Sequence, residues 1–102
     1  MKIVAVTSCA TGIAHTYMAA EALERAGKAA GHEITVETQG AGGFKPIAAE
    51  IIAAADVIIL ANDVGIREKD RFENHKILQS TPKAAIKDAA GLIEQAVALA
   101  AE

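Results

Sequence analysis

The start of the chain most constrains what it can fold into. Residues 2–7 form a short apolar run rich in β-branched side chains, which is typical of a buried parallel strand. Residues 14–30 then show the apolar spacing of an amphipathic helix. The single cysteine, Cys9, lies between them, where a strand ends and a loop leads into a helix. Because ligands bind at this edge of parallel α/β sheets, the sequence predicts a functional site around Cys9.

The residues of this loop suit an anion held beside a reactive thiol. A free thiol has a pKa near ~8.5, and a helix N-terminus lowers it by favouring the thiolate. The same backbone N–H groups favour a phosphate. Gly12 allows a positive φ that turns successive amides toward one point, while Thr11, His15 and Thr16 add side-chain donors. The pattern favours a nucleophilic Cys9 in an anion-binding loop, with a buried inert thiol as the simpler alternative.

Three further segments predict strands. Residues 33–38 alternate polar and apolar side chains, as a half-exposed edge strand does. Residues 56–61 form a continuous apolar run typical of a central parallel strand, and residues 76–79 a short fourth strand. Residues 39–43 are rich in glycine and predict a flexible loop at the same sheet edge as Cys9.

Residues 14–30 predict a helix with one apolar face. Its expected inward stripe is Tyr17, Ala20, Leu23 and Ala26 with Gly27. On the solvent side, Glu21 precedes Arg25 by four residues, the favourable order for an ion pair. Gly31 is placed to end the helix.

Two more helices are expected. Pro46 suits the first position of a short helix that buries Ile47 and Ile51. Thr81 and Pro82 suit the start of a single C-terminal helix, as a cap followed by a first-turn proline. The expected buried stripe of this helix is Ile86, Ala89, Ile93, Ala96 with Val97, and Ala100.

This element order predicts an α/β fold. We expect a single-domain three-layer sandwich, with a four-stranded parallel sheet in the order 2-1-3-4 flanked by helices. The 102 residues suffice for one domain with a core of its own. The order places the switch point between the first and third strands, directly above Cys9.

Composition and charge exclude several classes of function. A net charge of -3 gives no basis for binding nucleic acid. One cysteine excludes an internal disulfide framework and fits a reducing cytosol. No stretch resembles a signal peptide or reaches membrane-spanning length, so we expect a soluble protein. The three scattered histidines lack the spacing of metal ligands, so we expect neither a metal nor another cofactor.

A dense run of charges occupies residues 65–75, with Phe72 as its lone apolar anchor. Such a run is usually a solvated loop or a short helical turn. The functional alternative is that Arg67 or Arg71 docks a partner beside the Cys9 loop. The sequence leaves both interpretations open.

The loop and the helix that follows it resemble a known family. The run Cys-Ala-Thr-Gly-Ile-Ala-His-Thr-Tyr-Met-Ala-Ala-Glu over residues 9–21 resembles the fructose-type enzyme IIB component of the bacterial phosphoenolpyruvate-dependent sugar phosphotransferase system (PTS). Residues 36–40, 55–59 and 70–72 are also similar to the family. Two departures stand out: Ala10 replaces a usual proline, and residues 42–46 lack the usual acidic, Asn- and Leu-containing stretch.

The resemblance implies a phosphotransferase that works through a phosphocysteine. Cys9 would accept a phosphoryl group from a phosphohistidine on the IIA component. It would pass the group to a sugar, fructose or fructose-like, bound by the membrane component IIC. The implied phosphate-binding residues are Ala10, Thr11, Gly12, Ile13, Ala14, His15 and Thr16. The family implies a fructose-type EIIB domain over residues 1–102 that is cytoplasmic and associates with the membrane through IIC. The sequence would look the same for a separate subunit and for a domain of a longer polypeptide.

Other functional classes remain as alternatives. Cysteine phosphatases carry Cys-x5-Arg-Ser/Thr after a first strand, but here His15 stands at the arginine position and Thr16 follows. Without the bidentate guanidinium the loop fits a trigonal phosphoryl group less well, which favours a carrier. A non-catalytic docking module would tolerate Cys9→Ser. A redox role is disfavoured because the chain has no second cysteine to resolve an oxidised thiol.

Overall fold

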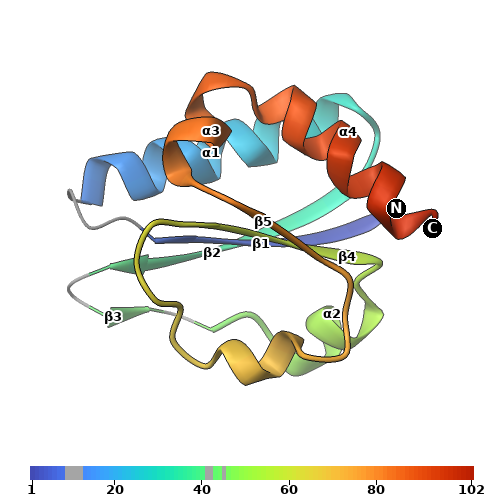
Figure 1. The fold of residues 1–102 in the computed structure, drawn as a ribbon, viewed down its shortest axis with the longest axis horizontal. Helices are drawn as coiled ribbons and strands as arrows, with labels where there is room; N and C mark the ends of the chain where they lie inside the picture. Colours follow the sequence, from blue (N-terminus) through green and yellow to red (C-terminus); the bar gives the residue numbers. More distant parts are fainter. Residues whose placement is uncertain (9–12, 41–42, 45) are drawn as a thin grey trace.

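A parallel sheet between two layers of helices organises the fold (Figure 1). The computed structural model describes residues 1–8, 13–40, 43–44 and 46–102. The parallel strands are β1 (Lys2–Ser8), β2 (Glu33–Gly40), β4 (Val57–Asn62) and β5 (Ile77–Ser80). They lie in the order β2-β1-β4-β5, which confirms the order 2-1-3-4 expected for the four parallel strands.

The helices divide between the two faces of this sheet. One face is covered by α1 (Ile13–Ala29), α3 (Pro82–Lys87) and α4 (Ala89–Ala100) (Figure 1). The other is covered by α2 (Ala49–Ala54) and the short 3₁₀ helix η1 (Lys69–Phe72). None of the helices in the described part of the chain is both long and apolar enough to span a bilayer.

Burial on both faces explains the two continuous apolar runs. In β1, Ile3 and Ala5 pack with residues of α1, α3 and α4, whereas Val4 and Val6 pack with residues of α2 and η1. Residues 57–61 of β4 alternate in the same way and are all buried. Such strands need apolar side chains at every position, so they lack the polar alternation of a half-exposed strand.

Helix α1 faces the sheet through small side chains. Ala20, Leu23 and Gly27 of the predicted stripe are buried and Ala26 packs against the core, but Tyr17 is 58% exposed. Thr16 and Ala19 are buried as well. A Cβ on Gly27 would lie 2.8 Å from Cγ2 of Ile34, so the helix approaches β2 at a point where only glycine fits.

The C-terminal end of α1 forms as predicted. Gly31 has a φ of 84°, its N–H donates to Lys28 O at 3.0 Å, and the His32 N–H donates to Gly27 O at 3.0 Å. This is a Schellman motif, which satisfies the last carbonyls of a helix. The predicted ion pair between Glu21 and Arg25 is also present, at 2.6 Å.

The segment after β2 differs from the flexible loop predicted over residues 39–43. Strand β2 continues to Gly40, and a two-residue strand, β3 (Gly43–Phe44), pairs with it in antiparallel orientation. The full sheet therefore has the order β3-β2-β1-β4-β5. The hairpin gives partners to backbone groups on the outer side of β2 that an edge strand otherwise leaves open. Residues 41–42 lie outside the described residues.

Helix α2 starts later than predicted. It begins at Ala49 rather than Pro46, and its buried residue is Ile52, while Ile51 is 42% exposed. The cause is a tertiary hydrogen bond. The Ile47 N–H donates to the Glu37 carboxylate at 2.9 Å, and Ala48 stays extended with a ψ of 138°.

The C-terminal region forms two helices instead of the single helix predicted. Thr81 caps α3 as expected, accepting from the Ala84 N–H at 3.1 Å, and Pro82 occupies the first turn. Asp88 then leaves helical geometry with a φ of -151° and caps α4 by accepting from the Gly91 N–H at 3.1 Å. The aspartate side chain competes for backbone N–H groups in this way. It therefore divides a segment whose apolar periodicity alone predicts one continuous helix. Ile93 and Ala96 of the predicted stripe are buried.

Candidate functional site

The carboxyl edge of the sheet holds Ser8, the residue that precedes the predicted site. Ser8, the last residue of β1, lies between Gln39 of β2 and Asn62 of β4. The N–H of Asp63, the residue that follows β4, donates to the Ser8 carbonyl oxygen at 3.2 Å. Residues 9–12 join Ser8 to α1, and Cys9, Ala10, Thr11 and Gly12 lie outside the described residues.

The described part of the predicted phosphate-binding set forms the first turn of α1. Helix α1 begins at Ile13 and continues through Ala14. His15 is exposed and Thr16 is buried, so the two side chains leave the turn on different sides. The turn holds no acidic residue that would oppose the positive end of the helix dipole.

Thr16 connects this turn to β1. The Thr7 hydroxyl donates to the Thr16 carbonyl at 3.0 Å, and both side chains are at most 2% exposed. The Thr16 Oγ1 atom is itself buried and has no hydrogen-bond partner among the described residues. Since buried hydroxyls are normally paired, this atom has a hydrogen-bonding capacity that the described residues leave unused.

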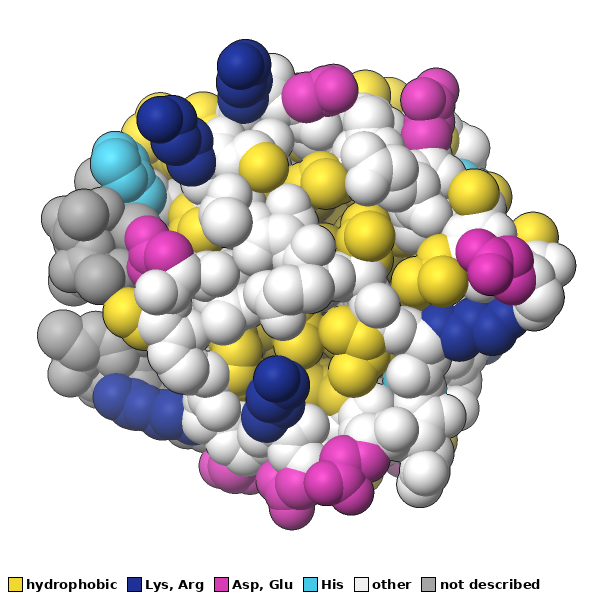
Figure 2. All heavy atoms as spheres, viewed as in Figure 1, with side chains coloured by type: hydrophobic (Ala, Val, Ile, Leu, Met, Phe, Trp, Pro, Cys, Tyr) yellow, Lys and Arg dark blue, Asp and Glu magenta, His cyan; other side chains and the backbone are white. Residues whose placement is uncertain are grey.

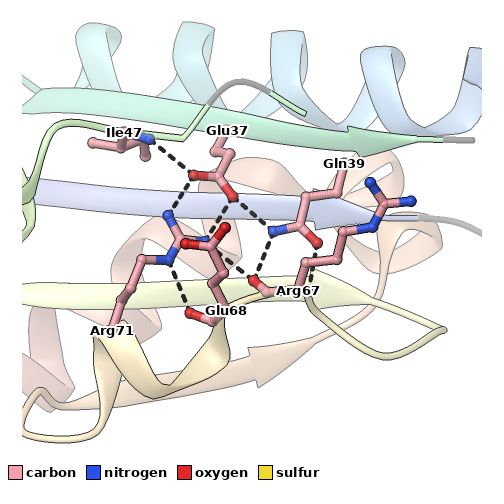
Figure 3. Close-up of polar contacts among 6 residues, drawn as sticks. All are labelled: Glu37, Gln39, Ile47, Arg67, Glu68 and Arg71. Carbon is pink, nitrogen blue, oxygen red and sulfur yellow. Dashed lines mark hydrogen bonds and ion pairs between the residues drawn. The ribbon is translucent and has the colours of Figure 1, made fainter. Parts of the chain in front are cut away.

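Glu37 is the centre of a buried polar network near the same edge (Figure 3). Arg71 Nη1 and Nη2 donate to its Oε1 and Oε2 at 2.8 and 2.9 Å. The Ile47 N–H donates to Oε1 at 2.9 Å, and Gln39 Nε2 donates to Oε2 at 2.7 Å. The Glu37 side chain is fully buried and that of Arg71 is 17% exposed. Each carboxylate oxygen therefore accepts two hydrogen bonds, which makes a buried charge tolerable.

The network shifts the pKa values of both charged partners. Burial alone raises the pKa of Glu37, but hydrogen bonds from Arg71, Gln39 and the Ile47 N–H outweigh it and hold the pKa below its ordinary value of 4.5. The hydrogen bond to Glu37 raises the pKa of Arg71, against the opposing effect of burial. Both groups are therefore charged at neutral pH.

Arg71 also fixes the turn that carries it. Its Nε donates to Glu68 O at 2.8 Å and its Nη2 to Arg67 O at 3.2 Å, while its guanidinium lies 4.8 Å from the centroid of the buried Phe72 ring. The predicted short helical turn is present as η1. The Arg71 guanidinium faces the buried Glu37 carboxylate. The partner-docking role considered for Arg67 or Arg71 stays a prediction.

Sequence reasoning missed the role of Glu37. Its strand alternates polar and apolar residues, so its polar face was expected to meet solvent, whereas η1 and residues 46–48 cover that face at Glu37. One signal in the sequence was an arginine directly before Phe72, the lone apolar residue of a charged run. That signal indicates that Arg71 is a buried cation, but it does not indicate that Glu37 is its partner.

Charged side chains lie around the edge of the face drawn in Figure 2. Lys or Arg, acidic and His side chains are among those at the end where β1 and β2 finish (Figure 2). Hydrophobic side chains show mainly along the middle of this face. Within the described ranges, no three His, Cys, Asp or Glu residues cluster as metal ligands would.

Comparisons with known proteins identify the class. Residues 4–95 match the family described as "PTS system, Lactose/Cellobiose specific IIB subunit". The chain is 47% identical over 95 residues to the PTS system fructose-like EIIB component 2 of Escherichia coli K12, covering 92% of this chain and 90% of that protein. It is 49% identical over 100 residues to the PTS system fructose-specific EIIB'BC component of Xanthomonas campestris pv. campestris, covering 95% of this chain and 17% of that protein.

A solved structure agrees with the sequence relatives. The solution structure of the Enzyme IIB subunit of the PTS system from Escherichia coli K12 matches with a TM-score of 0.86 at 43% identity, covering 92% of this chain and 88% of that chain. The chain belongs to the IIB subunit family of the sugar phosphotransferase system. Within that family it is a fructose-like IIB component, which confirms the resemblance drawn from the motif of residues 9–21.

Proposed function

We propose that this chain is the phosphoryl carrier of a fructose-type phosphotransferase system, with Cys9 as the residue that carries the group. One observation supports this most directly. Ser8, which precedes Cys9, lies between Gln39 and Asn62 at the carboxyl edge of the parallel sheet, and α1 begins only four residues after Cys9. A thiol in that stretch of chain is next to both a sheet edge and a helix N-terminus.

Two transfers make up the reaction. In the first, the Cys9 thiolate attacks phosphorus in line, a sulfur–phosphorus bond forms, and the bond to the donor histidine nitrogen breaks, its electron pair leaving with the imidazole. In the second, a sugar hydroxyl oxygen bonds to phosphorus, the sulfur–phosphorus bond breaks, the hydroxyl proton is released and the thiolate is restored. Negative charge rests on the equatorial phosphoryl oxygens throughout, so fixed donors aimed at them accelerate both steps.

We assign the donors to Ala10, Thr11, Gly12, Ile13, Ala14, His15 and Thr16. The first turn of α1 contributes backbone N–H groups that have no acceptor within the helix, and the positive end of the helix dipole. The buried Thr16 hydroxyl, without a described partner, is available to complete the site. No acidic side chain in that turn repels a dianion.

The partners follow from the family. We propose that a IIA component donates the phosphoryl group and that the sugar is bound by a membrane component IIC, through which the chain associates with the membrane. The name of the Xanthomonas relative, EIIB'BC, supports a C component as partner. The relatives named fructose-like or fructose-specific support fructose or a similar sugar as the acceptor.

A phosphotransfer assay read by intact mass tests this function. The purified chain is mixed with phosphoenolpyruvate, enzyme I, HPr and a fructose-type IIA protein, beside a Cys9→Ser variant. We expect one added phosphoryl group that requires IIA and is absent from the variant. Absence of the group with several IIA proteins would refute the carrier function. Rapid, Cys9-dependent release of phosphate from an aryl phosphate would favour a phosphatase instead.

A further inference from the structure

We propose that Arg67 contacts the phosphoryl group as it passes to Cys9, and that the buried Gln39 positions Arg67 for this contact. The inference rests on the proposed function, since it concerns the same transfer. It assigns a role to one residue of the charged run over 65–75 and to the buried network beside the sheet edge.

The segment between β4 and η1 borders the residue before Cys9. It leaves β4 at Asn62, which pairs with Ser8, and the Asp63 N–H donates to Ser8 O at 3.2 Å. It then returns to the other neighbour of Ser8, because Arg67 is hydrogen-bonded to Gln39. The segment thus begins and ends on the two residues that flank Ser8.

Gln39 holds the main chain of Arg67 on both sides. Its Oε1 accepts from the Arg67 N–H at 2.8 Å, and its Nε2 donates to Arg67 O at 3.2 Å. Gln39 is 2% exposed, and its Nε2 is also bonded to Glu37 at 2.7 Å. Arg71 supplies a second donor to Arg67 O at 3.2 Å. Three hydrogen bonds from two buried or half-buried side chains therefore fix the main chain of one exposed residue.

The Arg67 side chain points toward the carboxyl edge of the sheet. It is exposed, and Figure 3 shows it pointing away from Arg71 and along the direction in which β1 and β2 end. A guanidinium suits this place because it binds phosphoryl oxygens in a planar, bidentate way. His15 stands where the phosphatase pattern has its arginine, so a guanidinium reaching in from another segment would supply what the loop lacks.

Transfer kinetics from a phosphorylated fructose-type IIA protein test the contact. Single-turnover rates are measured against IIA concentration, which separates the maximal rate from the half-saturating concentration. Arg67→Gln should lower the maximal rate at least about tenfold, because it removes a donor to the transferring group, and Arg67→Lys should retain part of the rate. Arg25→Gln is the matched control, since it removes the same charge from an arginine whose side chain is 77% exposed on α1.

Two results would overturn the contact. One is an Arg67→Gln variant with the maximal rate of the Arg25→Gln control. The other is an Arg67→Gln variant in which only the half-saturating concentration rises, because that would make Arg67 a contact for the IIA surface and not for the phosphoryl group.

The positioning role of Gln39 has its own test. Gln39→Met should slow transfer, and the double variant with Arg67→Gln should be no slower than Arg67→Gln alone, since Gln39 acts through Arg67. If the rate losses of the two single variants multiply in the double variant, Gln39 does not act through Arg67. Melting curves check the fold. If Gln39→Met does not fold, Gln39→Asn replaces it in the same comparison, since it keeps the amide and shortens its reach.

The wild-type chain separates this inference from the proposed function. If the wild type accepts no phosphoryl group from IIA, the carrier function fails. If the wild type is phosphorylated at Cys9 and Arg67→Gln transfers at the wild-type rate, only the role of Arg67 fails.

Discussion

At the scale of single residues, two buried polar side chains near the sheet edge differ in how they are satisfied. Glu37 accepts hydrogen bonds at both oxygens from Arg71, Gln39 and Ile47. Thr16 Oγ1 has no partner among the described residues. A fully satisfied buried charge contributes to structure, whereas a buried hydroxyl without a partner costs free energy unless a ligand supplies one. The contrast gives Glu37 a structural role and is consistent with the role proposed for Thr16 in binding the phosphoryl group.

The first prediction concerns Thr16→Val. Valine has nearly the same shape, and it removes a hydroxyl that lacks a described partner, so the variant should be at least as stable as the wild type. Phosphoryl transfer to Cys9 should be slower, because a donor at the site is lost. Urea unfolding and the transfer assay measure the two effects. A variant that is clearly less stable would show that the hydroxyl has a structural partner.

The second prediction concerns pH. Because the folded pKa of Glu37 lies below its ordinary value of 4.5, the stability it contributes is complete above that value and is lost as pH falls through the folded pKa. Glu37→Gln should be roughly 3–5 kcal/mol less stable at pH 7, since it leaves Arg71 buried without its charge partner. The difference should shrink as the pH is lowered below 4.5, the ordinary value.

Urea unfolding at a series of pH values measures this effect. Glu33→Gln is the control, because Glu33 lies on the same strand and is exposed. It should show little change at any pH. A stability difference for Glu37→Gln that stays constant from pH 7 into the acid range would contradict the assigned pKa direction.

At the scale of elements, helix α1 links the fold to the site. Its C-terminal end is closed by the Schellman motif at Gly31, and its N-terminal turn follows directly on residues 9–12. Between these ends, Ala19 and Leu23 pack into the core under α3 and α4. The position of α1, and with it that of its first turn, is thus set by packing along its length.

The third prediction tests the closed end of α1. Gly31→Ala should destabilise the protein by about 1 kcal/mol, because alanine is strained at a positive φ. Gly65→Ala is the matched control, since a Cβ there meets open space. It should be neutral or slightly stabilising. Equal stabilities of the two variants would contradict the importance of the Gly31 conformation. Neither change should alter the transfer rate per folded molecule.

At the scale of the whole molecule, the two ends of the described chain lie together, away from the site (Figure 1). The Glu33 N–H donates to Met1 O at 3.0 Å, next to the start of β2. Lys76, just before β5, donates to the carbonyls of Ala100 and Glu102. Both ends are therefore tied to the amino ends of strands, while the proposed site lies at the carboxyl ends.

The fourth prediction follows from this arrangement. A folded domain joined after Glu102 by a flexible linker should leave the rate of phosphoryl transfer within about twofold of the wild type. A short flexible insertion between Val64 and Gly65, both exposed, should slow transfer, because that segment borders Ser8. The intact-mass assay followed over time measures both proteins. If the fusion slowed phosphoryl transfer and the insertion did not, the proposed position of the site at the carboxyl ends of the strands would be wrong.

Structural features that depend only on residues close together in the chain were predicted from the sequence. The apolar runs of residues 2–7 and 56–61 indicated the two central strands because both faces of such strands are buried. Gly31 and Thr81 indicated a helix end and a helix start because these interactions lie within a few residues. Right-handed crossovers left few topologies, and the resemblance to the IIB family supported the order 2-1-3-4 among them.

Tertiary contacts decided the rest. Periodicity could not fix the rotation of α1 that exposes Tyr17, because alanine and glycine on several faces leave the helix phase open. Asp88 and Ile47 changed helix boundaries through hydrogen bonds that compete with helical ones.

By itself, the sequence determined the α/β fold, the family and the place of Cys9 after the first strand. Only the tertiary structure determined that Glu37 and Arg71, 34 residues apart, form a buried ion pair, and that Gln39 holds Arg67 at the sheet edge. The physical reason is distance along the chain. Local patterns report which face of an element is apolar. The partner of a buried charge depends on which segments the sheet register and the crossovers bring side by side.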